Sequence, residues 1–177
     1  VKKYRSLLIE NAVAEDETML EKYLEVGEEG LSEEEIMTAI RAGVLGGKFY
    51  AVTGGDGRGV IVEKVLDLVK DLMPSPLDRG STWGENPKSG DKIERKPSAE
   101  EPLSGLAFKI TTDPFVGKLA YFRVYSGKIT AGSYVMNTSN GEKERIGRIV
   151  RMQADKREDV NEVEAGDIAA IVGLKAT

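Results

Sequence analysis

The residue types in this chain favour anion binding over covalent catalysis. Its 177 residues include neither Cys nor His, which excludes a disulfide framework, a thiolate nucleophile, a His general base and a zinc site of the usual kind. We therefore predict no catalytic residue and no metal site. The segment 143–157 instead gathers six Lys and Arg against two acids. Guanidinium groups at this density can contact the phosphates of a polyanion, and the candidates are Arg145, Arg148 and Arg151.

The same basic strip has a second interpretation, as an ordinary solvated strand surface. Four nearby acids could neutralise it, namely Glu158, Asp159, Glu162 and Glu164. The net charge of a segment is weak evidence for which partner it binds. The alternation of a strand would also separate Arg148 from Arg145 and Arg151 unless a bulge intervenes. Both interpretations stay open from the residues alone.

The first region of the chain, residues 1–73, is predicted to be mainly helical. Residues 1–73 carry apolar side chains at helical spacing, and Ser32 with Glu35 forms a capping box that starts a third helix. Lys48–Val52 is a short apolar run typical of a buried strand. Val62–Met73 has the pattern of a helix, and the glycine-rich run TGGDGRG (53–59) lies between them as a turn. This region is predicted to be α/β.

Residues 74–102 are predicted to be a linker. Five of the six prolines lie between Pro74 and Pro102, and proline both lacks an N–H donor and restricts the residue before it. The segment therefore cannot be a regular helix, and we expect a connection with one hairpin. Its single Trp83 is expected to pin the linker onto a domain, because large aromatic side chains usually serve burial rather than ligand stacking.

Residues 103–177 have the period-2 pattern of strands throughout. Leu106, Phe108 and Ile110 alternate with polar residues, and Asn140-Gly141 is a strong signal for a two-residue hairpin. Many short strands in so short a segment favour a small antiparallel barrel, because closure removes exposed edges. The predicted fold class is α+β in two parts, a helical α/β part followed by a small β-barrel.

Two long segments closely resemble the second domain of bacterial elongation factor G, the translocation GTPase of the ribosome. They are LAFKITTDPFVGKLAYFRVYSGKITAGSYVMN (106–137) and GEKERIGRIVRMQADKREDVNEVEAGDIAAIVGLK (141–175). Within them, the motifs Asp113–Lys118 and Arg123–Gly127 occur at the family's spacing. Three earlier segments resemble the end of that family's G domain and its junction with the barrel: LLIENAVAEDETMLEKYLE (7–25), LSEEEIMTAIRAG (31–43) and LMPSPLD (72–78).

The resemblance implies an internal piece of a ribosomal translocase. Residues 1–73 would be the C-terminal part of a P-loop GTPase domain, 74–102 a linker, and 103–177 a translation-factor-type barrel. The implied role is mechanical, with the barrel relaying the state of the G domain to the ribosome. Implied partners are small-subunit ribosomal RNA, through Arg145, Arg148 and Arg151, and basic stalk proteins of the large subunit, through the acidic helices. In residues 1–50 eleven acids oppose six cations, and a purely solubilising surface is the alternative.

The resemblance also sets an expectation for nucleotide. The chain has no Gly-Lys-Ser/Thr loop for phosphate and no Asn-Lys-x-Asp element for guanine. GTP or GDP with Mg is therefore expected in the parent protein, and neither a cofactor nor hydrolysis in this fragment alone. One guanine-side turn of the family, Gly-Ser-Ala, aligns with Gly54, Gly55 and Asp56. The Asp56 carboxylate would face the guanine carbonyl edge and repel it, and a plain strand-to-helix turn is the alternative.

Other identities remain open at this stage. A ribosomal protection protein or a release factor of the same fold shares the barrel, and Gly55-Asp56 suggests a non-hydrolysing ribosome-binding paralogue. No apolar stretch approaches the roughly 20 residues of a membrane span, so we expect a cytoplasmic monomer. The chain stops at Lys175–Thr177, before the Thr-Gly-Asp continuation usual in the family. We therefore expect a missing closing strand and an exposed sheet edge.

Overall fold

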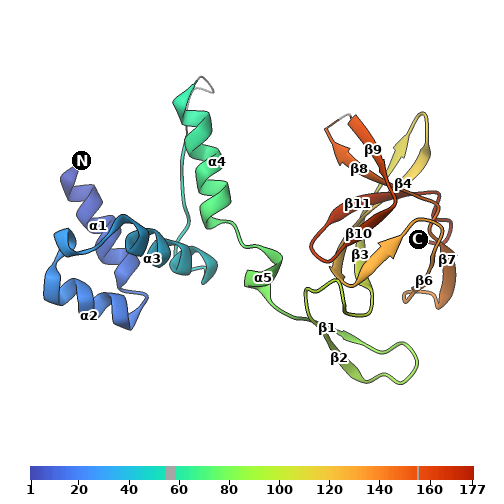
Figure 1. Cartoon of the computed structure of the whole chain (residues 1–177), viewed down its shortest axis with the longest axis horizontal. Coiled ribbons are helices and arrows are strands. Elements are labelled where there is room, and N and C mark those ends of the chain that lie inside the picture. Colours follow the sequence, from blue (N-terminus) through green and yellow to red (C-terminus); the bar gives the residue numbers. More distant parts are fainter. Residues whose placement is uncertain (55–58, 155) are drawn as a thin grey trace. The chain divides into compact units, whose positions relative to one another are not determined.

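The computed structural model describes residues 1–54, 59–154 and 156–177 (Figure 1). The chain forms two compact units, Val1–Pro74 and Ser75–Thr177. The first unit is helical and the second is built from antiparallel strands, so the mixed helix and sheet content agrees with the predicted fold class. Within the described residues, no helix is both long and apolar enough to cross a membrane.

The first unit is built around three helices that enclose a small core. Its elements are α1 (Lys2–Val13), α2 (Glu17–Val26), the 3-10 turn η1 (Glu28–Gly30), α3 (Glu33–Leu45) and α4 (Val60–Leu72). Ile9 and Val13 of α1 pack with Leu31 and with Ile36 of α3, and side chains of α2 close over them. The core therefore joins α1, α2 and α3.

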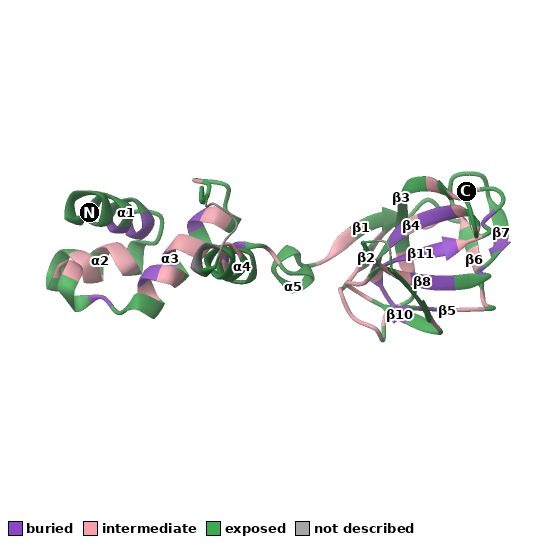
Figure 2. Cartoon of the chain, turned by 90° about the horizontal axis from the view of Figure 1, so that it is seen from above, coloured by how far each residue is buried: buried purple, intermediate pink, exposed green. Residues whose placement is uncertain are grey.

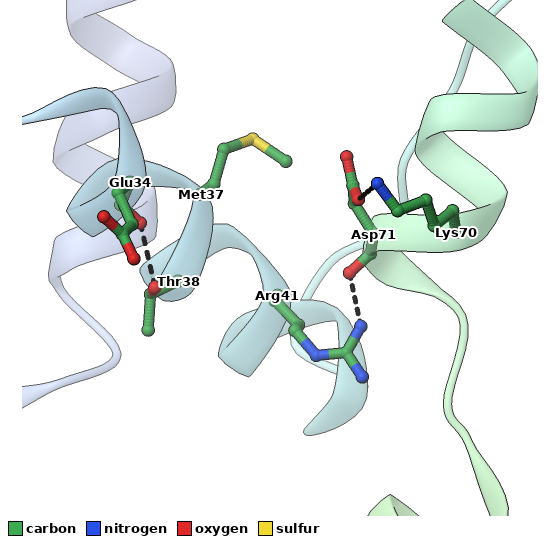
Figure 3. A pocket seen from close by; sticks show the side chains of 6 residues that line it. All are labelled: Glu34, Met37, Thr38, Arg41, Lys70 and Asp71. Atoms are coloured by element: carbon green, nitrogen blue, oxygen red, sulfur yellow. Dashed lines mark hydrogen bonds and ion pairs between the residues drawn. The ribbon is translucent and has the colours of Figure 1, made fainter.

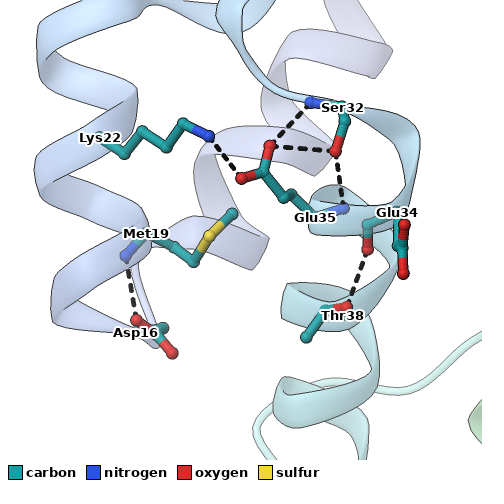
Figure 4. A network of polar contacts seen from close by, with 7 residues as sticks. All are labelled: Asp16, Met19, Lys22, Ser32, Glu34, Glu35 and Thr38. Atoms are coloured by element: carbon teal, nitrogen blue, oxygen red, sulfur yellow. Dashed lines mark hydrogen bonds and ion pairs between the residues drawn. The ribbon is translucent and has the colours of Figure 1, made fainter.

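The start of α3 is fixed by the predicted capping box, which is confirmed (Figure 4). The Glu35 amide donates to Ser32 Oγ at 3.2 Å, and the Ser32 amide donates to Glu35 Oε2 at 2.9 Å. Lys22 of α2 pairs with the same carboxylate. The hydrogen bonds from Lys22 and then from Ser32 lower the pKa of Glu35 to about 2. This carboxylate therefore both caps α3 and joins it to α2.

Of two predictions for the end of this unit, one is wrong and one is confirmed. Lys48–Val52 is not a strand, and the Val52 side chain is 94% exposed. The predicted helix is confirmed as α4; Leu66 and Val69 are exposed, and Leu72 is buried. The missing strand and the exposed residues of α4 have the same physical reason. The described residues of Val1–Pro74 contain no strand that could pair with 48–52 and cover α4.

The linker contains the expected hairpin. After one turn of helix, α5 (Pro76–Arg79), the strands β1 (Thr82–Glu85) and β2 (Lys92–Arg95) pair antiparallel. The expectation that Trp83 is buried against a domain is wrong, since its side chain is exposed and carries the Lys92 ammonium 4.5 Å from its ring centroid. The two-stranded ribbon offers the ring no apolar layer to pack against, so a cation covers it instead.

The rest of the second unit is entirely β (Figure 1). The strands are β3 (Ser104–Asp113), β4 (Gly117–Ser126), β5 (Lys128–Thr130), β6 (Tyr134–Asn137), β7 (Glu142–Arg145), β8 (Arg148–Gln153), β9 (Lys156–Val160), β10 (Glu162–Glu164) and β11 (Ile168–Val172). One sheet has the order β3-β4-β11-β8-β9, and the pairs β5-β10 and β6-β7 complete the structure. Every pairing is antiparallel.

One core holds these sheets together. Phe122 and Val124 of β4, Ile129 of β5, Ile149 of β8 and Val163 of β10 all belong to it, together with residues of β11. Figure 2 shows the buried positions running along the central strands β4, β11 and β8. Because three sheets contribute to a single interior, the arrangement is that of a small barrel.

Strand β3 lies at one edge of the five-stranded sheet. Among the described strands it pairs only with β4, and its register shifts between Ala107 and Lys109. The alternating pattern correctly predicts this strand, but Leu106, Phe108 and Ile110 are all exposed. An edge position with a bulge explains this, since neither a second neighbouring strand nor a regular pleat directs these side chains into the core.

Candidate functional site

The turn between β3 and β4 is the most highly organised feature of the barrel surface. Asp113 Oδ1 accepts the backbone N–H of Phe115 at 2.8 Å and that of Val116 at 3.0 Å. An Asp side chain that bonds the backbone two and three residues on is a standard way of fixing a turn. The backbone hydrogen bond from Phe115 lowers the pKa of Asp113, burial opposes this, and Val116 and Arg157 lower it further.

Arg157 of β9 holds this turn from another part of the sequence. Its guanidinium donates to Asp113 Oδ1 at 3.0 Å and lies 5.7 Å from the centre of the Phe115 ring. Val116 packs against a second apolar cluster formed by Leu119, Val150 and Ala170. The turn is therefore fixed by its own backbone, by an ion pair and by apolar packing.

The three predicted RNA-contact residues do not form one strip. Arg145 ends β7, in the β6-β7 pair, whereas Arg148 and Arg151 belong to β8 in the five-stranded sheet. Three positions along a strand reverse the side-chain direction, so Arg148 and Arg151 face opposite sides of β8. Arg148 pairs with Asp159 at 3.7 Å, and Arg151 pairs with Asp167 at 3.5 Å. Their contact with RNA stays a prediction.

The predicted guanine-side turn is only partly described. Gly54 is exposed, and no heavy atom lies within 4 Å of the position that a Cβ would occupy there. Gly55 and Asp56 lie outside the described residues. A role for Gly54, Gly55 and Asp56 in nucleotide binding therefore stays a prediction.

A buried carboxylate in β7 was not identified from the sequence. The Glu144 side chain is 7% exposed and accepts hydrogen bonds from the amides of Lys175 and Ala176, each at 3.0 Å, from Thr177 Oγ1 and from Asn137 Nδ2. Burial raises the pKa of Glu144, but these four donors outweigh it and lower the pKa to about 2. Lys118 also donates to the Thr177 carbonyl oxygen. The segment 175–177 is thus tied to β7 and β4.

An open hollow of about 420 Å³ lies between α3 and α4 in the first unit (Figure 3). Its lining includes the acids Glu34 and Asp71 and the bases Arg41 and Lys70. The Arg41 guanidinium donates to the Asp71 carbonyl oxygen, and the Lys70 ammonium lies 3.8 Å from the Asp71 carboxylate. With two acids and two bases in its lining, the hollow has no clear preference for a charged ligand. In the part of the chain that is described, no cluster of three or more acids could hold a metal ion.

The antiparallel barrel and its hairpin turn between β3 and β4 lie in the part of the chain that matches a known family. Residues 102–177 match the family model of elongation factor G domain 2. This part of the chain is therefore similar to the second domain of elongation factor G.

A solved structure extends the likeness beyond the barrel. A crystal structure of a protein from Thermus thermophilus is 28% identical to this chain and matches it with a TM-score of 0.70. The match covers 98% of this chain but 23% of that protein. The chain therefore spans less than a quarter of the length of this solved relative.

Proposed function

We propose that the chain is an internal part of an elongation-factor-G-like translational GTPase that moves tRNA and mRNA on the ribosome. The observation that carries this proposal is the match of residues 102–177 to elongation factor G domain 2. The length of the Thermus relative is consistent with a longer parent protein that contains this segment. In such a parent the barrel relays the nucleotide state of the G domain to the ribosome, and the role of this segment is mechanical.

We further propose that the first unit is the end of the G domain. This is supported by the exposed apolar residues Val62, Leu66 and Val69 of α4 and by exposed Met73 directly after it. They recur every three or four residues, so they form one stripe along the helix. A stripe of this kind is stable in water mainly when it packs against another element. In an α/β domain that element is a sheet.

Replacing Leu66 by Gln tests this assignment. Leu66 is 63% exposed, so in the 177-residue chain we expect a change in the free energy of unfolding within about 0.5 kcal/mol. In the parent protein the same change removes a buried Leu, and we expect a loss of about 2 kcal/mol. Chemical denaturation of both proteins measures this difference. Lys64→Gln on the same helix is the matched control, and an equal effect of Leu66→Gln in chain and parent would contradict the assignment.

Ribosome contact is proposed for both units. The cations of the barrel suit the phosphates of small-subunit RNA, although the ion pairs of Arg148 and Arg151 reduce the charge that each presents. The acid-rich surface of α1, α2 and α3 suits the basic stalk proteins of the large subunit, which is a second and independent contact. The proposed cellular location is the cytoplasm, where ribosomes act.

The nucleotide proposal concerns the parent protein. GTP or GDP with Mg would bind mainly through residues outside this chain, because the chain lacks the phosphate-loop and Asn-Lys-x-Asp sequences. The experiment is equilibrium binding of a fluorescent GDP analogue to the parent, with the 177-residue chain as control. Guanine-specific binding by the parent alone is the expected result. Absence of binding by either protein would contradict the GTPase proposal and favour a ribosome-binding paralogue.

A further inference from the structure

Two asparagine side chains organise the turn between β6 and β7. Asn137 Oδ1 accepts the backbone N–H of Ser139 at 3.0 Å, and Asn140 Oδ1 accepts that of Glu142 at 2.9 Å. In both cases the side chain bonds the backbone two residues on, which is the hydrogen bond of an Asx turn. This bond folds the side-chain carbonyl back over the peptide group that follows. It also polarises the carbonyl, as a donor in an oxyanion hole does.

The two side chains differ in what surrounds them. Asn137 is half-buried, its amide nitrogen donates to Glu144 Oε1 at 2.9 Å, and the next residue is the β-branched Thr138. Asn140 is exposed, and within the described residues its amide nitrogen has no hydrogen-bond partner. The next residue is Gly141, which has no side chain to hinder an approach to the Asn140 carbonyl carbon. Of the two, only Asn140 combines a polarised carbonyl with an unhindered neighbour and a free amide.

We propose that Asn140 is a site of spontaneous deamidation, with water as the co-reactant. In the first step the peptide nitrogen of Gly141 attacks Asn140 Cγ, the bond from Cγ to Nδ2 breaks, and ammonia leaves with the proton of the Gly141 N–H. The product of this step is a succinimide. The Glu142 N–H stabilises the negative charge that develops on Asn140 Oδ1 during the attack. Water then opens the ring at either carbonyl and leaves aspartate or isoaspartate at this position.

One native contact must open before the attack. The Gly141 N–H donates to the Asn137 carbonyl oxygen at 2.8 Å and holds the peptide group in place. Gly141 is exposed, so water can replace this carbonyl oxygen at little net cost in free energy. Exposed turns open locally far more readily than a core does. The reaction therefore needs an opening of the turn and not an unfolding of the barrel.

Deamidation is expected to change the contacts of the neighbouring strand. Isoaspartate carries the main chain through the former side chain, which lengthens the turn between the paired Asn137 and Glu142 by a methylene group. The next strand, β7, contains Glu144, whose carboxylate holds the amides of Lys175 and Ala176. A longer turn therefore loosens the last residues of the chain. Aspartate keeps the original backbone and changes mainly the charge.

The test incubates the folded 177-residue chain at mildly alkaline pH and follows each asparagine by peptide mass spectrometry. Asn140 is expected to lose its amide at a rate within about tenfold of that in denaturant, because one exposed hydrogen bond has to open. Asn137 is the matched control in the same turn and is expected to keep its amide in the folded chain. Enzymatic methylation of the new carboxyl group identifies isoaspartate.

A second measurement separates the longer backbone from the added charge. Amide exchange at Lys175 and Ala176 is expected to speed up in the incubated chain that contains isoaspartate. The variant Asn140→Asp has the charge without the longer backbone, and its exchange at these two amides is expected to match that of the unmodified chain.

Two results would overturn the site itself. If Asn140 keeps its amide in the folded chain and loses it in denaturant, the turn protects the residue and the proposal is wrong. Equal loss at Asn137 and Asn140 in the folded chain would show that the glycine and the free amide do not select the site. Equally fast exchange in Asn140→Asp would contradict the role of the longer turn. None of these results involves the ribosome, so the proposed function is tested separately.

Discussion

Replacing Gly127 by Ala is expected to destabilise the barrel by about 3 kcal/mol. Gly127 lies between β4 and β5 with φ of +72°, a conformation that L side chains rarely adopt. A methyl group there would lie 2.6 Å from the carbonyl oxygen of Glu101 and 2.6 Å from the backbone nitrogen of Leu103. Neither neighbour is a flexible side chain, so the backbone of 101–103 would have to move. Native-state amide exchange of β4 and β11 measures the loss.

Gly132→Ala is the matched control for this prediction. Gly132 also has positive φ, +82°, but no heavy atom lies within 4 Å of its Cβ position. Only backbone strain should destabilise this variant, and we expect its free energy of unfolding to fall by about 1 kcal/mol. The difference between the two substitutions isolates the close approach of residues 101–103. Equal losses would show that this contact does not constrain the barrel.

Replacing Glu144 by Gln is expected to destabilise the barrel by about 2 kcal/mol at neutral pH and to release the segment 175–177. The carboxylate accepts four hydrogen bonds in a nearly buried site, and charged acceptors contribute more than neutral ones. The amide of Gln keeps the shape but loses the charge and one acceptor oxygen. Faster amide exchange at Lys175 and Ala176 measures the release. Protection that is unchanged at these two amides would contradict the clamp.

The same carboxylate predicts how stability depends on pH. Its pKa in the folded chain is about 2, below the ordinary value of 4.5. Its contribution is therefore fully present above about 4.5 and is lost as the pH falls towards 2. The barrel should weaken over this window, and Glu144→Gln should flatten the dependence. Glu35 has a similar pKa but lies in the first unit, so Glu35→Gln should leave the barrel amides unaffected.

Local signals in the sequence were sufficient for the helices and most strands. The Ser32–Glu35 capping box is a contact between neighbours in sequence, and the structure has it as predicted. The predicted hairpin at Asn140-Gly141 joins β6 and β7, with Gly141 at positive φ, but its loop is residues 138–141 rather than two residues, because the last pair is Asn137 and Glu142. Such elements depend on contacts between residues that are close in sequence, so the sequence alone is enough to predict them.

Features that depend on distant parts of the chain were not predictable in this way. Lys48–Val52 has the composition of a buried strand, but a strand forms only beside another strand, and the described first unit offers none. The same absence leaves the apolar stripe of α4 exposed. Composition alone therefore did not predict the structure of these two segments in this chain.

The candidate site shows the same limit. The motif Asp113–Lys118 was evident as a resemblance, but its pairing with Arg157 joins residues 44 positions apart. In the sequence Glu144 is one of two acids in the basic segment 143–157, whereas in the structure it accepts hydrogen bonds from the backbone of 175–176. No pattern in sequence signals either contact. Their partners are set by the barrel topology, which brings β9 to the β3–β4 turn and the last residues to β7.

The most direct test of the account is single-turnover translocation by the parent protein on ribosomes that carry tRNA in the pre-translocation state. We expect GTP-dependent movement of the mRNA by one codon, with the movement lost in Gly127→Ala, where the barrel is destabilised. Binding of the parent to ribosomes without any movement of the mRNA would contradict it, and would leave the chain as part of a ribosome-binding protein that is not a translocase.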